Sequence, residues 1–463
     1  MSHSRRTFLQ RTMCGALGAA AFSAGLKRFG MINALAQAQN AAATDYRALV
    51  CIFLFGGNDG NNMIVPYDGY ADYARVRGVA GTSGSIALAQ SDLLQIAPPS
   101  GQGIKYGLHP NLPELQGLFN SGKLAAMCNV GTLVQPVTRA QFLQNGARPY
   151  NLFSHSDQQA QWQTSISASP SATGWAGRTA DRTRSLNGTA SFPMIVSVAG
   201  ASVFTNGVQT YPIALTPGQT FGLQGYDQKS TNSIVAARYN AVQQLLTNDR
   251  DASLIDSASN LTSQAIGNSE VLSAAFKSAA ALQTVFPNTG LGNQMKQIAQ
   301  IIATRNSLGL KRQIFFCSLG GFDTHNNELA THVNLYTQLS KAMKSFYDAT
   351  VELGVTSNVT TFTQSDFGRT FKPAAGGGSD HAWGSHHLIM GDAVRGGDFY
   401  GTYPTLALAG PNDSGSEGRW IPTASVDQYA ATLATWYGLA PSDLPTVFPS
   451  INRFASSNLG FMG

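Results

Sequence analysis

The sequence predicts an α/β fold with a mostly parallel sheet and helices on both faces. Short apolar runs rich in β-branched and aromatic residues recur along the chain and end at glycine or polar residues, which is typical of strands buried on both faces. Longer stretches of helical character lie between these runs. Strands that alternate with helices favour parallel pairing, because each helix carries the chain back to the start of the next strand.

The first predicted strand, 47–55, reads Arg-Ala-Leu-Val-Cys-Ile-Phe-Leu-Phe and ends at two glycines. Four later apolar runs repeat its pattern, at 124–130, 194–198, 313–319 and 359–363. Helices are predicted between the strands at 112–119, 157–163, 233–246, 271–282, 295–305 and 329–353. This order of elements indicates a doubly covered sheet.

One part of the chain differs in amino-acid composition from the rest. The segment at about 185–300 is rich in Ser, Thr, Asn, Gln and Ala and has weaker apolar runs. It predicts an insertion or cap, part β and part helical, within a single domain that spans 37–463.

The first 36 residues predict an export signal. Arg5 and Arg6 form a twin-arginine pattern, and an apolar run follows from Met13 to Leu26. The triplet 34–36, Ala-Leu-Ala, is a plausible small-residue cleavage site, and the triplet 36–38, Ala-Gln-Ala, is a second. The apolar run is too short to span a bilayer, so no transmembrane anchor is expected. We therefore expect a twin-arginine signal peptide over 1–36 and a periplasmic or secreted protein.

Composition argues against a nucleic-acid binder and against a disulfide framework. The chain has 30 Lys and Arg against 25 Asp and Glu, but residues 1–36 hold five basic residues and no acidic one. Without this segment the two signs balance at 25 each, so no basic patch for nucleic acid is predicted. Cys51, Cys128 and Cys317 lie in apolar runs and predict buried free thiols.

Three aspartates are expected to meet at one edge of the sheet. Asp59, Asp323 and Asp366 each come shortly after a predicted strand. Because the carboxyl ends of parallel strands share one edge, where ligands bind, these side chains should converge. Carboxylates brought together repel one another unless a cation neutralises them. The sequence therefore predicts one or two divalent cations at this edge.

Histidines extend the predicted ligand set. His325 is two residues from Asp323 and shares its face in extended backbone. His381, His386 and His387 follow a glycine-rich run that indicates a mobile loop able to reach the same edge. A mixed Asp and His shell favours Zn or Mn, with Ca or Mg as less favoured ions. The alternative is that these are ordinary turn residues, as Asp before Gly often is.

Two further positions could take part in catalysis. Ser154 and His155 precede a predicted helix, where helix N–H groups can hold an oxyanion and a metal can activate the hydroxyl. His155 could also be a ligand. Arg369 and Arg178 are candidates for binding an anionic substrate. The alternatives are an N-cap role for Ser154 and structural ion pairs for the arginines.

Taken together, several motifs resemble an exported bacterial family known as domain of unknown function 1501, which is similar to the alkaline phosphatase and sulfatase superfamily. The segments that carry the resemblance are 54–66, 107–110, 154–155, 175–178, 320–325, 365–370 and 380–381. The resemblance implies an alkaline phosphatase-like parallel-sheet fold and a two-metal site for phosphate or sulfate esters.

The resemblance also implies roles for individual residues. Asp59 would be the first-strand metal ligand, and Ser154 would lie near the nucleophile position. The remaining implied ligands are Asp323, His325, Asp366 and His381. Phe367 stands where the superfamily commonly has a metal-binding histidine, so the site could hold one metal, recruit His386 or His387, or be inactive.

The sequence thus predicts an exported metal-dependent hydrolase of phosphate or sulfate esters, with an anionic small molecule or polymer as substrate. The alternative is a non-catalytic protein of the same fold that acts as a binding or accessory partner of another exported protein. Metal content and ester hydrolysis distinguish the two.

Overall fold

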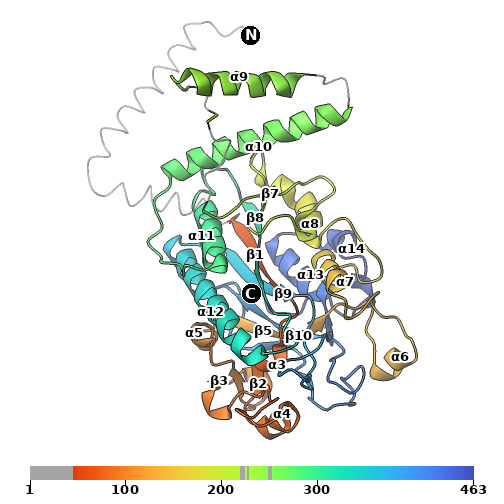
Figure 1. Ribbon diagram of the computed structural model, residues 1–463. Helices are drawn as coiled ribbons and strands as arrows, with labels where there is room; N and C mark the ends of the chain where they lie inside the picture. Colours follow the sequence, from red (N-terminus) through yellow and green to blue (C-terminus); the bar gives the residue numbers. More distant parts are fainter. Residues whose placement is uncertain (1–44, 219–224, 227–228, 249–252) are drawn as a thin grey trace, which may run out of the picture. The chain divides into compact units, whose positions relative to one another are not determined.

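A computed structural model describes residues 45–218, 225–226, 229–248 and 253–463 (Figure 1). The predicted signal peptide lies outside the described residues, so the twin-arginine signal stays a prediction. All contacts below lie within the unit Arg47–Gly463.

The centre of the main sheet is strand β1, Arg47–Phe55, which agrees with the predicted strand. Its interior residues are all buried, because both of its faces are covered. β1 pairs in parallel with β8, Arg312–Gly320, on one side and with β9, Val359–Ser365, on the other. The ends of these three strands carry the predicted aspartates to one edge.

Further strands extend the sheet in both directions. Beyond β8 lie β6, Ile195–Ser197, and β7, Ile213–Ala214, both parallel. Beyond β9 lies β10, Ser385–Met390, which is antiparallel to β9 and to β5, Leu124–Gly131. The described residues thus form a mixed, mostly parallel sheet, and the predicted α/β class is confirmed.

The outer elements of the sheet are short. β11, Phe399–Gly401, and β12, Ala424–Ser425, both pair in parallel with β5. A separate antiparallel sheet consists of β2 (Ile64–Pro66), β4 (Tyr106–Leu108) and β3 (Leu94–Ile96).

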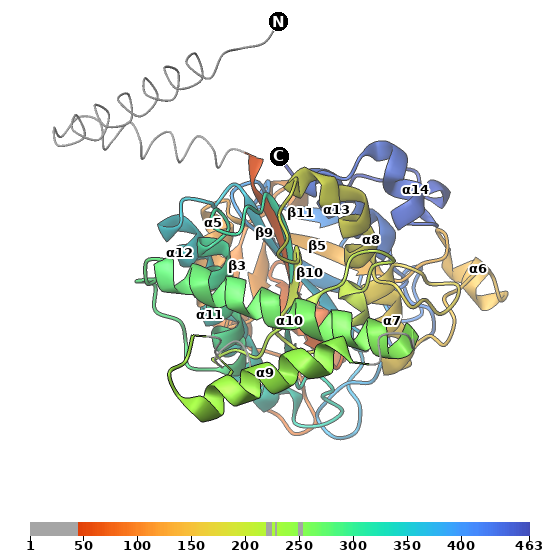
Figure 2. The ribbon, with the colours of Figure 1, turned by 90° about the horizontal axis from the view of Figure 1, so that it is seen from above.

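Helices cover both faces of the main sheet, as predicted (Figure 2). One face carries α5 (Pro113–Asn120), α11 (Gly290–Ala303) and α12 (Glu328–Glu352). The other carries α7 (His155–Thr164), α8 (Trp175–Thr183) and α13 (Val426–Tyr437). Shorter helices are α3 (Gly60–Met63), α4 (Tyr70–Arg77), α6 (Arg139–Leu143) and α14 (Leu444–Val447).

The segment 185–300 contributes to the main sheet as well as to its periphery. β6 and β7 belong to the sheet, and α11 packs against β8. The more exposed part is α9, Ser233–Thr247, with α10, Ser253–Ser278. The helix predicted at 271–282 covers only the end of α10, because the earlier Ser- and Asn-rich turns have a weak apolar pattern. The cap itself stays a prediction.

The prediction of buried free thiols can be compared with the structure. Cys51, Cys128 and Cys317 are buried and free, as predicted. Among the described residues, no helix is long and apolar enough to cross a membrane.

Candidate metal centre

The loops after β1 and β8 pack closely at the carboxyl edge of the sheet. Gly56 has a φ of 114°, a conformation that L side chains rarely adopt. A Cβ atom at Gly56 would lie 2.3 Å from the backbone nitrogen of Asp323, so only glycine fits there. This close approach fixes where Asp323 leaves the sheet.

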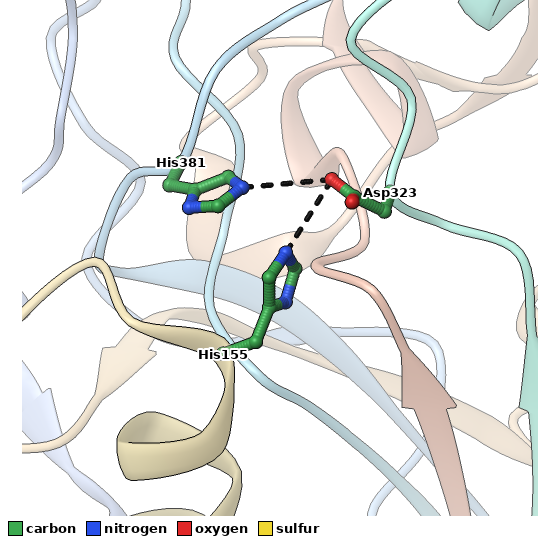
Figure 3. A group of neighbouring side chains, drawn as sticks. All are labelled: His155, Asp323 and His381. Atoms are coloured by element: carbon green, nitrogen blue, oxygen red, sulfur yellow. Dashed lines mark ion pairs between the residues drawn. The ribbon is translucent and has the colours of Figure 1, made fainter.

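Asp323 lies in a group of three potential metal ligands with His155 and His381 (Figure 3). Asp323 Oδ1 is 3.4 Å from His155 Nε2 and 3.5 Å from His381 Nε2. The three ligand atoms all lie within 4.8 Å of one another. His155 is the first residue of α7, and His381 comes from the loop that precedes β10. Three segments distant in sequence therefore supply the group.

The other nitrogen of each imidazole is held by an acceptor. His155 Nδ1 is 2.6 Å from Asp366 Oδ2, and His381 Nδ1 is 2.8 Å from the carbonyl oxygen of Phe153. A carboxylate and a carbonyl accept hydrogen bonds, so both Nδ1 atoms donate. In the neutral imidazole, each Nε2 then carries a lone pair directed toward Asp323. Two lone pairs and a carboxylate oxygen face the same space.

Phe153 adopts an unusual backbone conformation to make this contact. Its φ is 71°, in the left-handed region that costs an L-residue about 1–2 kcal/mol. Its N–H donates to Gln158 Oε1, and its carbonyl accepts from His381. Strain of this kind concentrates at functional sites.

His325 lies beside the group. Its Nε2 is 3.1 Å from Asp323 Oδ1 and 2.9 Å from His381 Nε2, and its Nδ1 is 3.0 Å from Asp380 Oδ1. The predicted pairing of Asp323 with His325 is therefore present in the structure. His325 could add a further nitrogen ligand.

The environment shifts the pKa values of the three residues. The hydrogen bond from His155 to Asp366 raises the pKa of this imidazole, against the opposing effect of burial. Burial lowers the pKa of His381. Burial opposes ionisation of Asp323, but the hydrogen bond and charge of Arg369 outweigh it and lower the pKa of this carboxyl. Asp323 is thus a carboxylate near neutral pH.

Asp366 is placed behind His155 and not in the group itself. It is buried, and its Oδ2 accepts from both His155 and Gln159, at 2.6 and 2.7 Å. Its Oδ1 accepts from Gly56 N at 3.2 Å. A carboxylate in this position orients a histidine ligand and increases its basicity.

Asp59 lies outside the group as well. Arg77 binds its carboxylate with two nitrogens, at 2.6 and 3.0 Å, and both side chains are fully buried. The guanidinium neutralises Asp59, which the sequence analysis expected a metal to do. The same Arg77 nitrogen, Nη1, also lies 3.5 Å from Glu328 Oε1.

His386 and His387 are also elsewhere. Both were expected on a mobile loop, but they belong to strand β10 and are buried. His386 stacks on Tyr403, and His387 packs against Trp162. The two adjacent histidines precede only three apolar residues in this six-residue strand, so it was not recognised as a strand pattern.

The two other predicted catalytic residues have clear contacts. Ser154 is the N-cap residue of α7, but its hydroxyl donates to Asp157 Oδ2 at 2.6 Å instead of capping a helix N–H. Arg369 is fully buried and donates to carbonyl oxygens of the chain and to Asp323. Its carbonyl partners are Gly56, Gly57, Phe322 and Ser379. Arg178 is likewise buried and donates to Thr164 and Val447 carbonyls.

Sequence reasoning missed Gln159, Arg77 and Glu328. Gln159 lies four residues after His155 on α7, so a helical pattern could have placed it on the same face. Arg77 and Glu328 are paired with Asp59 only through the tertiary fold, and no local pattern marks them.

Residues 46–414 match the family described as "Protein of unknown function (DUF1501)". The chain belongs to the DUF1501 family. No match was found among curated proteins.

Solved structures of low identity also align with the chain. Ps i-CgsB in complex with k-i-k-neocarrahexaose has 10% identity and a TM-score of 0.34, with 88% of this chain and 76% of that chain covered. The PsFucS1 sulfatase from Pseudoalteromonas sp. has 9% identity and a TM-score of 0.34, with coverages of 88% and 70%. The phosphonate monoester hydrolase SpPMH from Silicibacter pomeroyi has 8% identity and a TM-score of 0.34, with coverages of 87% and 77%. At these TM-scores, function has to be argued from this chain's own residues.

Proposed function

We propose that this DUF1501 protein is an exported metal-dependent hydrolase of phosphate or sulfate esters with an alkaline phosphatase-like site. The observation that carries the proposal is the convergence of His155 Nε2, His381 Nε2 and Asp323 Oδ1 within 4.8 Å, with both Nδ1 atoms held by acceptors. Such second contacts are typical of histidines that bind a metal.

The residues present fit a divalent cation. His155 Nε2 is a buried atom that makes no hydrogen bond, so a lone pair there is left without a partner unless a cation binds. Two imidazoles with one carboxylate suit Zn, Mn or Fe better than Ca or Mg. Three protein ligands also leave a coordination position for a water or a substrate oxygen, as in catalytic zinc sites.

The described residues contain one such group, which supports one cation more directly than two. Arg77 occupies the carboxylate of Asp59, and the oxygens of Asp366 are used by His155, Gln159 and Gly56. A bound cation would lower the pKa of a coordinated water or hydroxyl and offset the charge that develops on the ester.

The chain's own residues have separable roles in this proposal. Asp366 and the Phe153 carbonyl hold the two imidazoles, and Arg369 holds Asp323. Ser154 is a candidate nucleophile, since Asp157 accepts its hydroxyl proton at 2.6 Å and can take it up. A water is the other candidate. A Ser154→Ala variant that keeps its rate would assign the attack to water.

Metal analysis of the purified protein without residues 1–36 tests the proposal. We expect about one tightly bound Zn, Mn or Fe ion per chain, and thermal destabilisation on chelation, because a ligand that binds only the native state stabilises it. The protein should hydrolyse members of a panel of aryl phosphate and sulfate esters, and Asp323→Ala should not. Equal hydrolysis by both proteins would show that the assigned site is wrong.

The alternative is a non-catalytic binding or accessory protein. The burial of Arg369 favours it, because the sequence predicted that Arg369 binds the anionic substrate and a buried side chain cannot reach one. It predicts less than one tightly bound metal ion per chain, no loss of stability on chelation and no turnover of any ester in the panel.

A further inference from the structure

An ester hydrolase that acts on an anionic substrate needs a basic group beside its metal, and Arg369 cannot serve. Its side chain is fully buried, and its nitrogens already donate to backbone carbonyls and to Asp323. Moving it toward a substrate would break several buried hydrogen bonds at once.

Arg419 lies at the edge of the same site. Its Nε donates to the carbonyl oxygen of His381 at 2.9 Å. Its Cζ lies over the ring of Phe153, 5.0 Å from the ring centroid. The carbonyl of Phe153 in turn accepts from His381 Nδ1. The guanidinium, Phe153 and His381 thus contact one another pairwise, which fixes the guanidinium beside a predicted metal ligand.

Unlike Arg369, Arg419 reaches solvent. Its side chain is 29% exposed. Its Nη1 pairs with Glu417 Oε2 at 2.7 Å, and Glu417 is 39% exposed. Ion pairs at such exposure contribute little to stability, so another anion can replace the carboxylate at small cost. The hydrogen bond at Nε and the stacking on Phe153 remain during this exchange.

Charge also favours a cation here. Asp323 and Asp380 are about half exposed at the same edge, and both would repel an anionic ester. A guanidinium presents its N–H groups in a fixed plane that matches two oxygens of a phosphate or sulfate.

We propose that Arg419 is the anion-recognition residue of this site, and that Glu417 occupies its guanidinium until the phosphate or sulfate group of the substrate replaces it. The inference rests on the proposed function and adds the residue that selects anionic esters.

The test measures binding of inorganic phosphate and of sulfate to the metal-loaded protein by calorimetry, with metal content measured for each variant. Arg419→Met keeps much of the aliphatic stem over Phe153 but removes the charge. It should weaken binding of the anion by at least about tenfold, as the loss of a charge-assisted hydrogen bond does. Arg419→Lys should restore only part of the affinity, because it cannot bind in a planar, two-point manner.

Glu417→Gln is the matched variant with the opposite expectation, because it leaves the guanidinium without its competing carboxylate. It should tighten anion binding, with unchanged metal content. The inference is overturned if Arg419→Met binds phosphate and sulfate as tightly as the wild type, or if it loses the metal, since Arg419 would then support the site itself. A wild-type protein without metal would instead contradict the proposed function.

Discussion

At the scale of single residues, the site depends on which nitrogen of each histidine carries the proton. His155 and His381 both donate from Nδ1, to Asp366 and to the Phe153 carbonyl, and so direct Nε2 toward Asp323. Neither acceptor would itself bind the metal. Identifying ligands is therefore only part of describing the site.

Asp366→Asn tests this orienting role. The amide can still accept from His155, but it carries no charge and makes the imidazole a weaker ligand. We expect metal affinity to fall about 10- to 100-fold, with the fold retained. Competition with a chromophoric chelator measures the change. An unaltered affinity would show that Asp366 does not support His155.

Buried histidines predict how stability depends on pH. Burial lowers the pKa of His386 to about 4 and that of His387 to about 3, from an ordinary value of 6.5. At pH values between the lowered pKa of each folded histidine and 6.5, the unfolded chain binds a proton that the folded chain does not. The free energy of unfolding therefore falls as the pH drops below 6.5. Each group contributes at most about 1.4 kcal/mol per pH unit.

His387→Phe should flatten this dependence, because the ring between Trp162 and Tyr429 no longer titrates. Urea unfolding of the metal-free protein at pH 7 and pH 5 measures the effect. The difference in unfolding free energy between the two pH values should be smaller for the variant. A difference equal to that of the wild type would mean that His387 is not the titrating group.

At the scale of elements, buried ion pairs of Arg77 help to attach α4 to the core. Arg77 binds Asp59, the N-cap residue of α3, and lies 3.5 Å from Glu328 on α12. We expect Arg77→Met to destabilise the protein by about 3–5 kcal/mol, because it leaves a buried carboxylate unpaired. Arg75→Met on the same helix is the control.

Arg75 pairs with Asp72 at 3.3 Å in an exposed position, so its loss should change stability by less than about 1 kcal/mol. Denaturant unfolding compares the two variants. Similar effects for both would contradict the importance of the buried pair.

The loop after β1 gives a second prediction at this scale. Gly56→Ala would place a Cβ atom 2.3 Å from the Asp323 nitrogen and require a φ near 114°. We expect lower stability and weaker metal binding, because the loop that carries Asp323 must move. Gly320→Ala, where no atom lies within 4 Å of the added Cβ, should leave both properties near those of the wild type. Calorimetry and metal titration measure both.

At the scale of the whole molecule, the sequence predicted the parts of the fold that local patterns determine. β1 is a continuous apolar run, and its bounds agree with the prediction. Asp323 and His325 both follow β8, at the edge where the parallel strands end. His381 reaches the same edge from the loop before β10. β10 escaped prediction because two of its six residues are histidines, which suggested ligands.

Long-range pairing explains the rest of what was missed. Asp59 has the residue type and position of a ligand, but Arg77 neutralises it through contacts that only the folded chain makes. Asp366 likewise follows a strand as predicted, yet its oxygens face His155, Gln159 and Gly56. Residue type and strand position predict which aspartates reach the edge, but not which of them faces His155 and His381 there.

Export is a prediction about the entire chain. If the predicted twin-arginine signal directs export, the double substitution Arg5→Lys with Arg6→Lys should keep the protein in the cytoplasm. Cell fractionation and N-terminal sequencing of the exported protein measure this, with cleavage expected after Ala36. Export of the double variant at the wild-type level would exclude the twin-arginine route.

The buried guanidinium of Arg369 has a consequence for protein engineering. It holds the loops at Gly56, Phe322 and Ser379 by their carbonyl oxygens, which every amino acid possesses. Exposed side chains on the surrounding loops can therefore be exchanged without loss of the hydrogen bonds from Arg369 to these carbonyl oxygens. If the proposed hydrolase activity holds, a library that varies Glu417 and its exposed neighbours while Arg369 stays fixed offers a route to new ester preferences.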